Sequence, residues 1–352
     1  MTRRVGAEQE SHVKVAGLDN KHRRARVWLR VVSYFLAAAA LITLSLMWWW
    51  DYEPEPFDVA KAAQQRAAAD GRPVVVGTAT TVALIDVGNT LLDKRGGYLS
   101  NDFGPPGVLM DNVPNWEFGA LIQVRDLAKA FRNEFSRSQT QSTEDVDLLE
   151  ADPLFSTPSD RWLLPASEGQ YRKAIGHMEA YLDRLSDADE YNAQFFARAD
   201  NLADWLAVVE KRLGSLSQRL SASVGQERID TDLAGDKDAQ QSTPGESPRV
   251  VKTPWSKVDD VFYEARGSVW ALSHFLRAVE VDFEPVLRDK NALVSLRQII
   301  RELEEAQQPL SSPIVLNGSP YGFFANHSLV MANYISRANA AVIDLRKLLE
   351  RG

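Results

Sequence analysis

The sequence predicts an all-α protein, with one N-terminal transmembrane helix followed by a helical bundle that contains a long helical hairpin. Three observations support this fold class: an uncharged apolar run near the start, two later segments with apolar residues at helical spacing, and no pair of clear strand segments. The chain has 352 residues, of which 45% are hydrophobic. This length and composition are sufficient for a large packed core.

Residues 31–50 form the predicted transmembrane helix. They contain no charged side chain, and an apolar helix needs about 20 residues to cross the roughly 30 Å hydrocarbon layer of a bilayer. Tryptophan is typical of membrane interfaces, where its ring lies in the acyl boundary and its N–H among the headgroups. We therefore expect Trp28 at the near interface and Trp48, Trp49 and Trp50 at the far one.

The charge on the two sides of this run predicts its orientation. Residues 1–30 contain eight Lys and Arg against three Asp and Glu, and 32 Lys and Arg stand against 45 Asp and Glu after residue 50. The positive-inside rule makes 1–30 a basic cytoplasmic tail, and 51–57 a spacer before an α-helical domain, 58–352, across the membrane. About 30 residues precede the apolar run and bulky residues follow it, which favours an uncleaved anchor over a signal peptide.

Composition excludes several functions. The chain has no cysteine, so disulfides, thiol nucleophiles and thiolate metal sites are ruled out. The excess of acidic residues in the body argues against nucleic acid as a partner, because phosphate backbones are bound mainly by Lys and Arg. Phosphate-binding loops, paired-histidine zinc motifs and nucleophile elbows are missing from the sequence, so we expect no cofactor and no metal site.

Most of the domain after the spacer has the pattern of helices. Gly96 or Gly97 closes the second of them, Val74 to Val76 are expected in a connector, and a long Gly/Pro/Asn loop follows over 96–114. Outside the hairpin, helices are expected at 58–69, 78–97, 115–138, 143–152, 167–186, 289–307 and 327–350.

The predicted hairpin comes from two segments whose apolar residues recur at steps of four and three, the spacing of coiled-coil seams. We expect the two helices to pack antiparallel on each other, with 222–254 as a disordered loop between them and Pro285 ending the second. The seams are Phe195, Ala199, Leu202, Leu206, Val209, Leu213, Leu216 and Leu220, and then Val258, Phe262, Ala265, Val269, Leu272, Leu276, Val279 and Phe283.

The long loop and the helix after it contain the candidate binding residues. Asn, Asp, Arg, Gln and Trp side chains gather there, and long ordered loops often carry function. The alternative is a structural loop held by Asn and Asp side chains, with the tryptophan simply buried. The candidates are Asn101, Asp102, Asp111, Asn112, Asn115, Trp116, Arg137 and Gln139.

Carboxylates offer a second possible chemistry. Glu117, Asp126, Glu144, Asp145 and Asp147 could include a pair for general acid and base catalysis of the glycosidase kind. The alternative is that they solvate helix faces, and sequence spacing cannot measure the separation that such catalysis requires.

Several stretches of the sequence resemble those of a known family. The stretches "GGYLSND", "PPG", "DNVPNWEFG", "FSRSQTQSTED" and "NHSLVMANYISRANAAVIDLR" are similar to proteobacterial single-span inner-membrane proteins classified as domain of unknown function 2333. The resemblance extends over nearly the whole chain, with the segment 222–254 as a feature of this member. It implies a Gram-negative inner membrane and a periplasmic body, and it assigns no activity, cofactor or catalytic residue.

These features favour a non-enzymatic envelope protein whose bundle docks another envelope protein, with the lipid bilayer as its other partner. One alternative is a hydrolase of peptidoglycan or lipid that uses carboxylate acid and base residues. The second alternative is a sensor subunit, but a cytoplasmic part of about 30 residues is too short for an output domain of its own.

Overall fold

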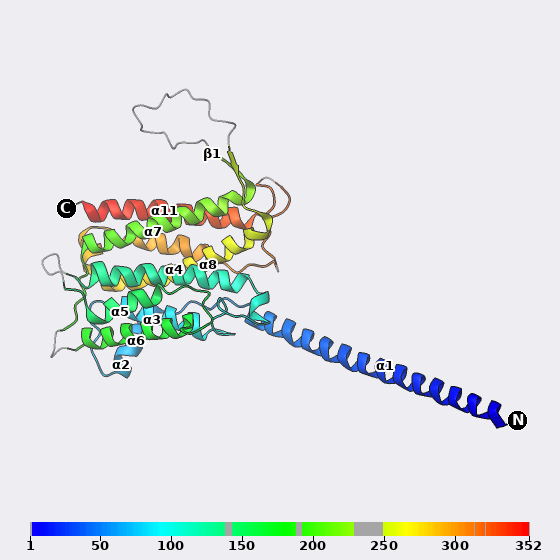
Figure 1. The fold of residues 1–352 in the computed structure, drawn as a ribbon. Coiled ribbons are helices and arrows are strands. Elements are labelled where there is room, and N and C mark those ends of the chain that lie inside the picture. The colour runs from blue at the N-terminus through cyan, green and yellow to red at the C-terminus, as the bar shows by residue number, and fades with distance from the viewer. Residues whose placement is uncertain are drawn as a thin grey trace, which may run out of the picture.

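A computed structural model describes residues 2–137, 143–187, 192–228, 249–312, 314–320 and 322–351. One long helix, α1 (Thr2–Trp50), projects from a bundle of the other helices (Figure 1). The bundle contains α2 (Val59–Ala69), α3 (Thr78–Asp93), α4 (Asn112–Ala130), α5 (Val146–Phe155), α6 (Ser167–Leu185), α7 (Ala199–Ser221), α8 (Val258–Asp282), α9 (Glu284–Asp289), α10 (Leu293–Glu305) and α11 (His327–Glu350).

The predicted fold class is confirmed, and most helices lie where the periodicity placed them. A π turn (Phe131–Phe135) continues α4, and α8 ends just before Pro285 as expected. Val74 to Val76 lie in a connector, and Gly96 and Gly97 adopt positive φ angles of 84° and 74° after α3. Glycine adopts this backbone region without steric cost, which explains why the chain turns there.

The helices run back and forth, so the loops gather at two ends of the bundle. We call the end from which α1 leaves the anchor end, and it carries the loops 94–111, 156–166, 252–257 and 306–326 (Figure 1). The opposite end is the far end, and it carries the loops 70–77 and 283–292 and the segments 136–137, 143–145, 186–187 and 192–198.

Helix α8 is the centre of the bundle. Of its 25 residues, 18 are buried, which is typical of a helix covered on all sides. It packs mainly on α4, and the two backbones approach closely where Gly119 faces Gly267. A Cβ atom on Gly119 would lie 1.9 Å from the carbonyl oxygen of Glu264, and one on Gly267 would lie 1.8 Å from that of Trp116.

The predicted pairing of the hairpin is corrected in one respect. Helices α7 and α8 touch, but the main partner of α7 is α11 and that of α8 is α4. The two glycines explain why α8 pairs with α4. Where both helices carry glycine at the crossing, their backbones can approach more closely than α8 could approach the leucine-rich seam of α7. The second seam is buried throughout and the first from Leu202 onward, while Phe195 and Ala199 are half-buried; the first begins one turn later than predicted because Phe195 precedes the helix.

The segment predicted as a disordered loop has ordered ends. Strands β1 (Gln226–Arg228) and β2 (Arg249–Val251) pair antiparallel, and short 3-10 turns flank them at Ala222–Val224 and Trp255–Lys257. The remainder, 229–248, lies outside the described residues, so the prediction of disorder stands untested there.

The contact between α4 and α8 predicts a strong effect of one methyl group. Gly267→Ala should lower the free energy of unfolding by about 1–3 kcal/mol or more, because the new Cβ meets backbone that cannot move alone. Urea unfolding of the full chain in detergent, followed by circular dichroism, measures the change.

Gly176→Ala is the matched control. Gly176 lies on the exposed side of α6 with no atom within 4 Å of an added Cβ, so alanine there should stabilise the chain by about 0.5–1 kcal/mol. Equal effects of the two substitutions would contradict the proposed close contact.

Candidate functional site

The predicted polar residues do not form one surface. Asn101 is buried, and its side-chain amide donates to the carbonyl of Arg161 at 3.3 Å. Asp102 and Asp111 are exposed, and the Asn115 amide donates to the carbonyl of Asp111 at 2.9 Å. These contacts hold the loop itself, as the structural alternative expects.

The remaining candidates are buried or lie elsewhere. Trp116 is buried against Trp270, with ring centroids 5.1 Å apart, and Asn112 is half-buried at the first position of α4. Arg137 follows the π turn at the far end, so the length of α4 separates it from the loop. Gln139 lies outside the described residues.

Glu117 organises the loop that follows α3. Its carboxylate is fully buried and accepts hydrogen bonds from the backbone N–H groups of Leu99 and Ser100, each at 2.8 Å, and from the Ser100 hydroxyl at 2.5 Å. The ammonium group of Lys94, only 3% exposed, pairs with the same carboxylate and also donates to the carbonyl of Gly97. A buried carboxylate with this many donors is a structural element rather than a free acid or base.

The other candidate carboxylates are also engaged by arginine. Arg212 pairs with Asp126 at 2.6 Å, and Arg132 pairs with Glu144 at 3.2 Å. Asp145 and Asp147 share Arg184, at 2.7 Å and 2.5 Å. Each carboxylate therefore already has a cationic partner.

The spacer 51–57 is bound to the central helix by a partly buried ion pair. Both carboxylate oxygens of Glu53 accept from the Arg266 guanidinium at 2.6 Å, and the Arg266 side chain is 7% exposed. Arg266 also donates to the carbonyl of Gln308 at 3.1 Å. The fork of the guanidinium thus joins the spacer, α8 and the loop after α10 at one point.

A second contact lies four residues further along the spacer, at Phe57. The ring of Phe57 stacks on that of His274 with centroids 4.1 Å apart, and the Phe57 N–H donates to Nε2 of the imidazole at 3.1 Å. Nδ1 lies 2.7 Å from the carbonyl of Trp270, so it carries the proton and Nε2 accepts. Burial lowers the pKa of His274 to about 4, which keeps the ring neutral.

The end of α1 is held by the turn after α3. The guanidinium of Arg95 lies 4.4 Å from the ring centroid of Trp49 and 4.1 Å from that of Tyr52. The indole of Trp50 packs on Gly96, where an added Cβ would lie 2.7 Å from the ring. Cation–π contacts and this close packing seat the helix on the bundle. Residues 49–57 make all of these contacts with the bundle, and we call this set of contacts the anchor junction.

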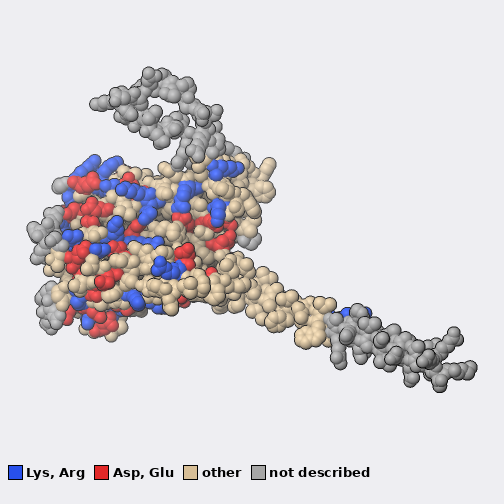
Figure 2. Space-filling model, in the orientation of Figure 1, with Lys and Arg blue, Asp and Glu red and all other residues tan. Residues whose placement is uncertain are grey.

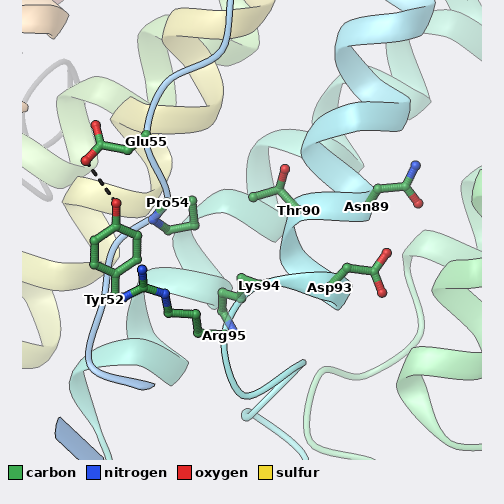
Figure 3. A pocket seen from close by; sticks show the side chains of 8 residues that line it. All are labelled: Tyr52, Pro54, Glu55, Asn89, Thr90, Asp93, Lys94 and Arg95. Carbon is green, nitrogen blue, oxygen red and sulfur yellow. Dashed lines mark hydrogen bonds between the residues drawn. The ribbon is translucent and has the colours of Figure 1, made fainter. Parts of the chain in front are cut away.

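A shallow pocket of about 490 Å³ opens beside the anchor junction (Figure 3). Asp93 at its edge is paired with Arg172 at 2.7 Å, and Lys94 is committed to Glu117. The pocket shows no nucleophile with an adjacent base, and among the described residues no group of three His, Asp or Glu side chains could hold a metal ion. Its lining residues are Tyr52, Pro54, Glu55, Asn89, Thr90, Asp93, Lys94 and Arg95.

The partners in the anchor junction could not be identified from the sequence. Glu53 and Arg266 are 213 positions apart, and Phe57 and His274 are 217 positions apart. Isolated charges and histidines have no periodicity that names a partner. The one local signal is Arg266, a charged residue on the buried face of the second seam. An unpaired charge is not buried, so such a residue indicates a partner of opposite charge.

Glu117→Gln should lower the free energy of unfolding by about 3–5 kcal/mol, because it leaves the buried ammonium of Lys94 without a counter-charge. Urea unfolding of the full chain in detergent measures this change in the free energy of unfolding. Asp93→Asn is the matched control: it breaks a pair whose side chains are more than half exposed, and it should cost at most about 1 kcal/mol.

His274 predicts a specific pH dependence. Its pKa is about 4 in the folded chain and 6.5 in the unfolded one, so both states are neutral above pH 6.5, and only the unfolded state gains the proton between pH 6.5 and 4. The free energy of unfolding should therefore fall by about 3 kcal/mol over this range through this group. Unfolding of the wild type and of His274→Gln at pH 7 and pH 4 isolates the contribution. An equal fall in the free energy of unfolding of the wild type and of His274→Gln would contradict the assignment of this pH dependence to His274.

Comparison with known proteins assigns the chain to a family but not to an activity. No curated protein and no solved structure matches it. A family model described as "Uncharacterized protein conserved in bacteria (DUF2333)" matches residues 22–352. Because this match covers nearly the whole chain and agrees with the resemblance seen in the sequence, the chain belongs to the DUF2333 family of bacterial proteins.

Proposed function

We propose that this protein is a non-enzymatic scaffold of the bacterial inner membrane, whose periplasmic bundle presents its helical faces to another envelope protein. The anchor junction is the observation that carries the proposal. The spacer is bound to α8 by the Glu53–Arg266 pair and the Phe57–His274 stack, and Arg95 holds the end of α1. These contacts hold the bundle in one orientation relative to its anchor, which suits a protein that presents a surface.

The anchor itself has the dimensions of a membrane span. Within the described side chains, the part of α1 from Arg26 to Trp50 is long and apolar enough to cross a bilayer, and none of its 18-residue apolar window is buried in the bundle. Trp28 and Trp48 are 70% and 80% exposed. Twenty residues of helix separate them, or about 30 Å at 1.5 Å per residue, which equals the hydrocarbon thickness. The basic residues before the span support an N-terminus in the cytoplasm.

The arrangement of carboxylates favours the scaffold over a hydrolase. Acid and base catalysis needs a carboxyl group that can exchange a proton with substrate in a cleft. The candidate carboxylates are bound by Lys94 or by arginines, and the pocket beside the anchor junction is shallow.

The orientation predicts the behaviour of a reporter. Alkaline phosphatase, which folds only in an oxidising compartment, should be active when fused after residue 352, whereas a fluorescent protein that folds in the cytoplasm should be dark there. The control fusion after Arg30, before the span, should give the opposite result. An active phosphatase after Arg30 together with an inactive one after residue 352 would reverse the proposed topology.

The scaffold proposal also predicts no turnover. The purified full chain, incubated with peptidoglycan sacculi or with phospholipid vesicles, should release no sugar fragment or fatty acid above the background of a preparation without the protein. Release of either product would favour the hydrolase.

A further inference from the structure

We propose that the anchor end of the bundle is a second lipid-contacting surface, which touches the leaflet where α1 emerges. The inference rests on the proposed function only in that α1 must span a bilayer. The surface, which we call the aromatic rim, consists of exposed side chains from the loops of the anchor end: Phe103, Trp162, Leu164, Trp255, Phe323 and Phe324.

Exposed aromatic residues are confined to one end of the bundle. Among the described residues outside α1, every exposed large aromatic side chain belongs to the aromatic rim, and Trp255 and Phe323 are 91% and 107% exposed. The exposed large apolar residues near the far end are aliphatic, such as Val146 and Val294. Solvent alone gives no reason for this asymmetry, and large exposed apolar groups mark sites of interaction.

The position of the aromatic rim places it close to lipid. Tyr52 lies two residues beyond the span and contacts Arg95, in the same loop as Phe103. The ring of Phe103 lies against Trp162 at 5.2 Å between centroids, and the Tyr98 hydroxyl donates to the carbonyl of Ser159 at 3.1 Å. The two loops are thus fastened to each other beside the anchor junction.

The remaining loops of the rim lie at the same end. The Arg266 guanidinium connects the spacer to the loop after α10, which contains Phe323 and Phe324, and the ring of Phe262 in α8 contacts that of His327, the first residue of α11. Figure 1 shows these loops at the end of the bundle from which α1 leaves. The loops of the rim therefore share the end of the bundle from which α1 leaves.

The charge distribution supports lipid as the occupant. In Figure 2 the charged side chains gather over the flank and far end of the visible face, whereas the end beside α1 is mostly uncharged. Exposed charged residues such as Asp102, Arg161 and Lys257 stand next to the rim and would face the headgroups, while tryptophan and phenylalanine suit the boundary between headgroups and acyl chains. A protein partner at this end would have to fit between the bundle and the membrane from which α1 emerges.

Depth-dependent fluorescence quenching tests the inference. The chain has no cysteine, so single-cysteine variants of the full chain can each take one fluorophore. We would label Leu164→Cys and Phe323→Cys in the rim, Val294→Cys at the far end and Leu41→Cys in the span, reconstitute each into phosphatidylglycerol and phosphatidylethanolamine vesicles, and add lipids with a nitroxide near the headgroup. All four native side chains are at least 66% exposed, so the substitutions should leave the fold intact, which circular dichroism checks.

The rim labels should lose at least about half as much emission as the label at Leu41, and the label at Val294 should lose none. Quenching at Leu41 without quenching at either rim position would overturn the lipid contact and leave the anchor intact. No quenching at Leu41 would instead contradict the membrane span, and with it the proposed function. If Phe323→Cys alone is lost to misfolding, Phe324→Cys, 73% exposed in the native chain, serves in its place.

A protein occupant would give a different result. The nitroxide lipids would then not quench the rim labels in vesicles. In native membranes, however, the bound protein would shield these labels from a water-soluble quencher. That result would overturn the lipid proposal.

Discussion

Glu117 carries its carboxylate in a site without contact with water, and a charge in such a site must be neutralised and hydrogen-bonded. Lys94 and the backbone of Leu99 and Ser100 satisfy it, and in doing so they fold the loop after α3 against the start of α4. The same loop presents Arg95 and Gly96 to the end of α1. One buried carboxylate therefore holds both the loop after α3 and the seat of α1.

The anchor junction connects this loop to the centre of the bundle. Arg266 and His274 lie two turns apart on α8, and they bind the spacer at Glu53 and Phe57. Because α8 is buried on most sides and packs closely on α4 through Gly119 and Gly267, the anchor is attached to the centre of the bundle. In the proposed topology, a bundle held in this way keeps one end towards the membrane, and this is the end where its exposed aromatic residues lie.

The helices and the apolar faces of the bundle were predictable because each depends on residues close together in the sequence. The spacing of Leu202, Leu206, Val209 and Leu213 indicates a buried helix face, and all four are buried in α7. Which helix covers that face is a different question, since any complementary apolar stripe could do so. The pairing of α7 with α11 was missed for that reason. The candidate site was predictable only as a polar loop, because the burial of Trp116 and the pairing of Glu117 depend on segments that meet only in the folded chain.

The sequence by itself determined the fold class, the apolar segment suited to a bilayer and the family, because composition, periodicity and motifs are properties of the linear chain. Only the tertiary structure decided which charges are paired, which helices are partners, and that the exposed aromatic loops gather at one end. The physical reason is that these features join residues hundreds of positions apart. Close packing selects such partners from many chemically equivalent ones.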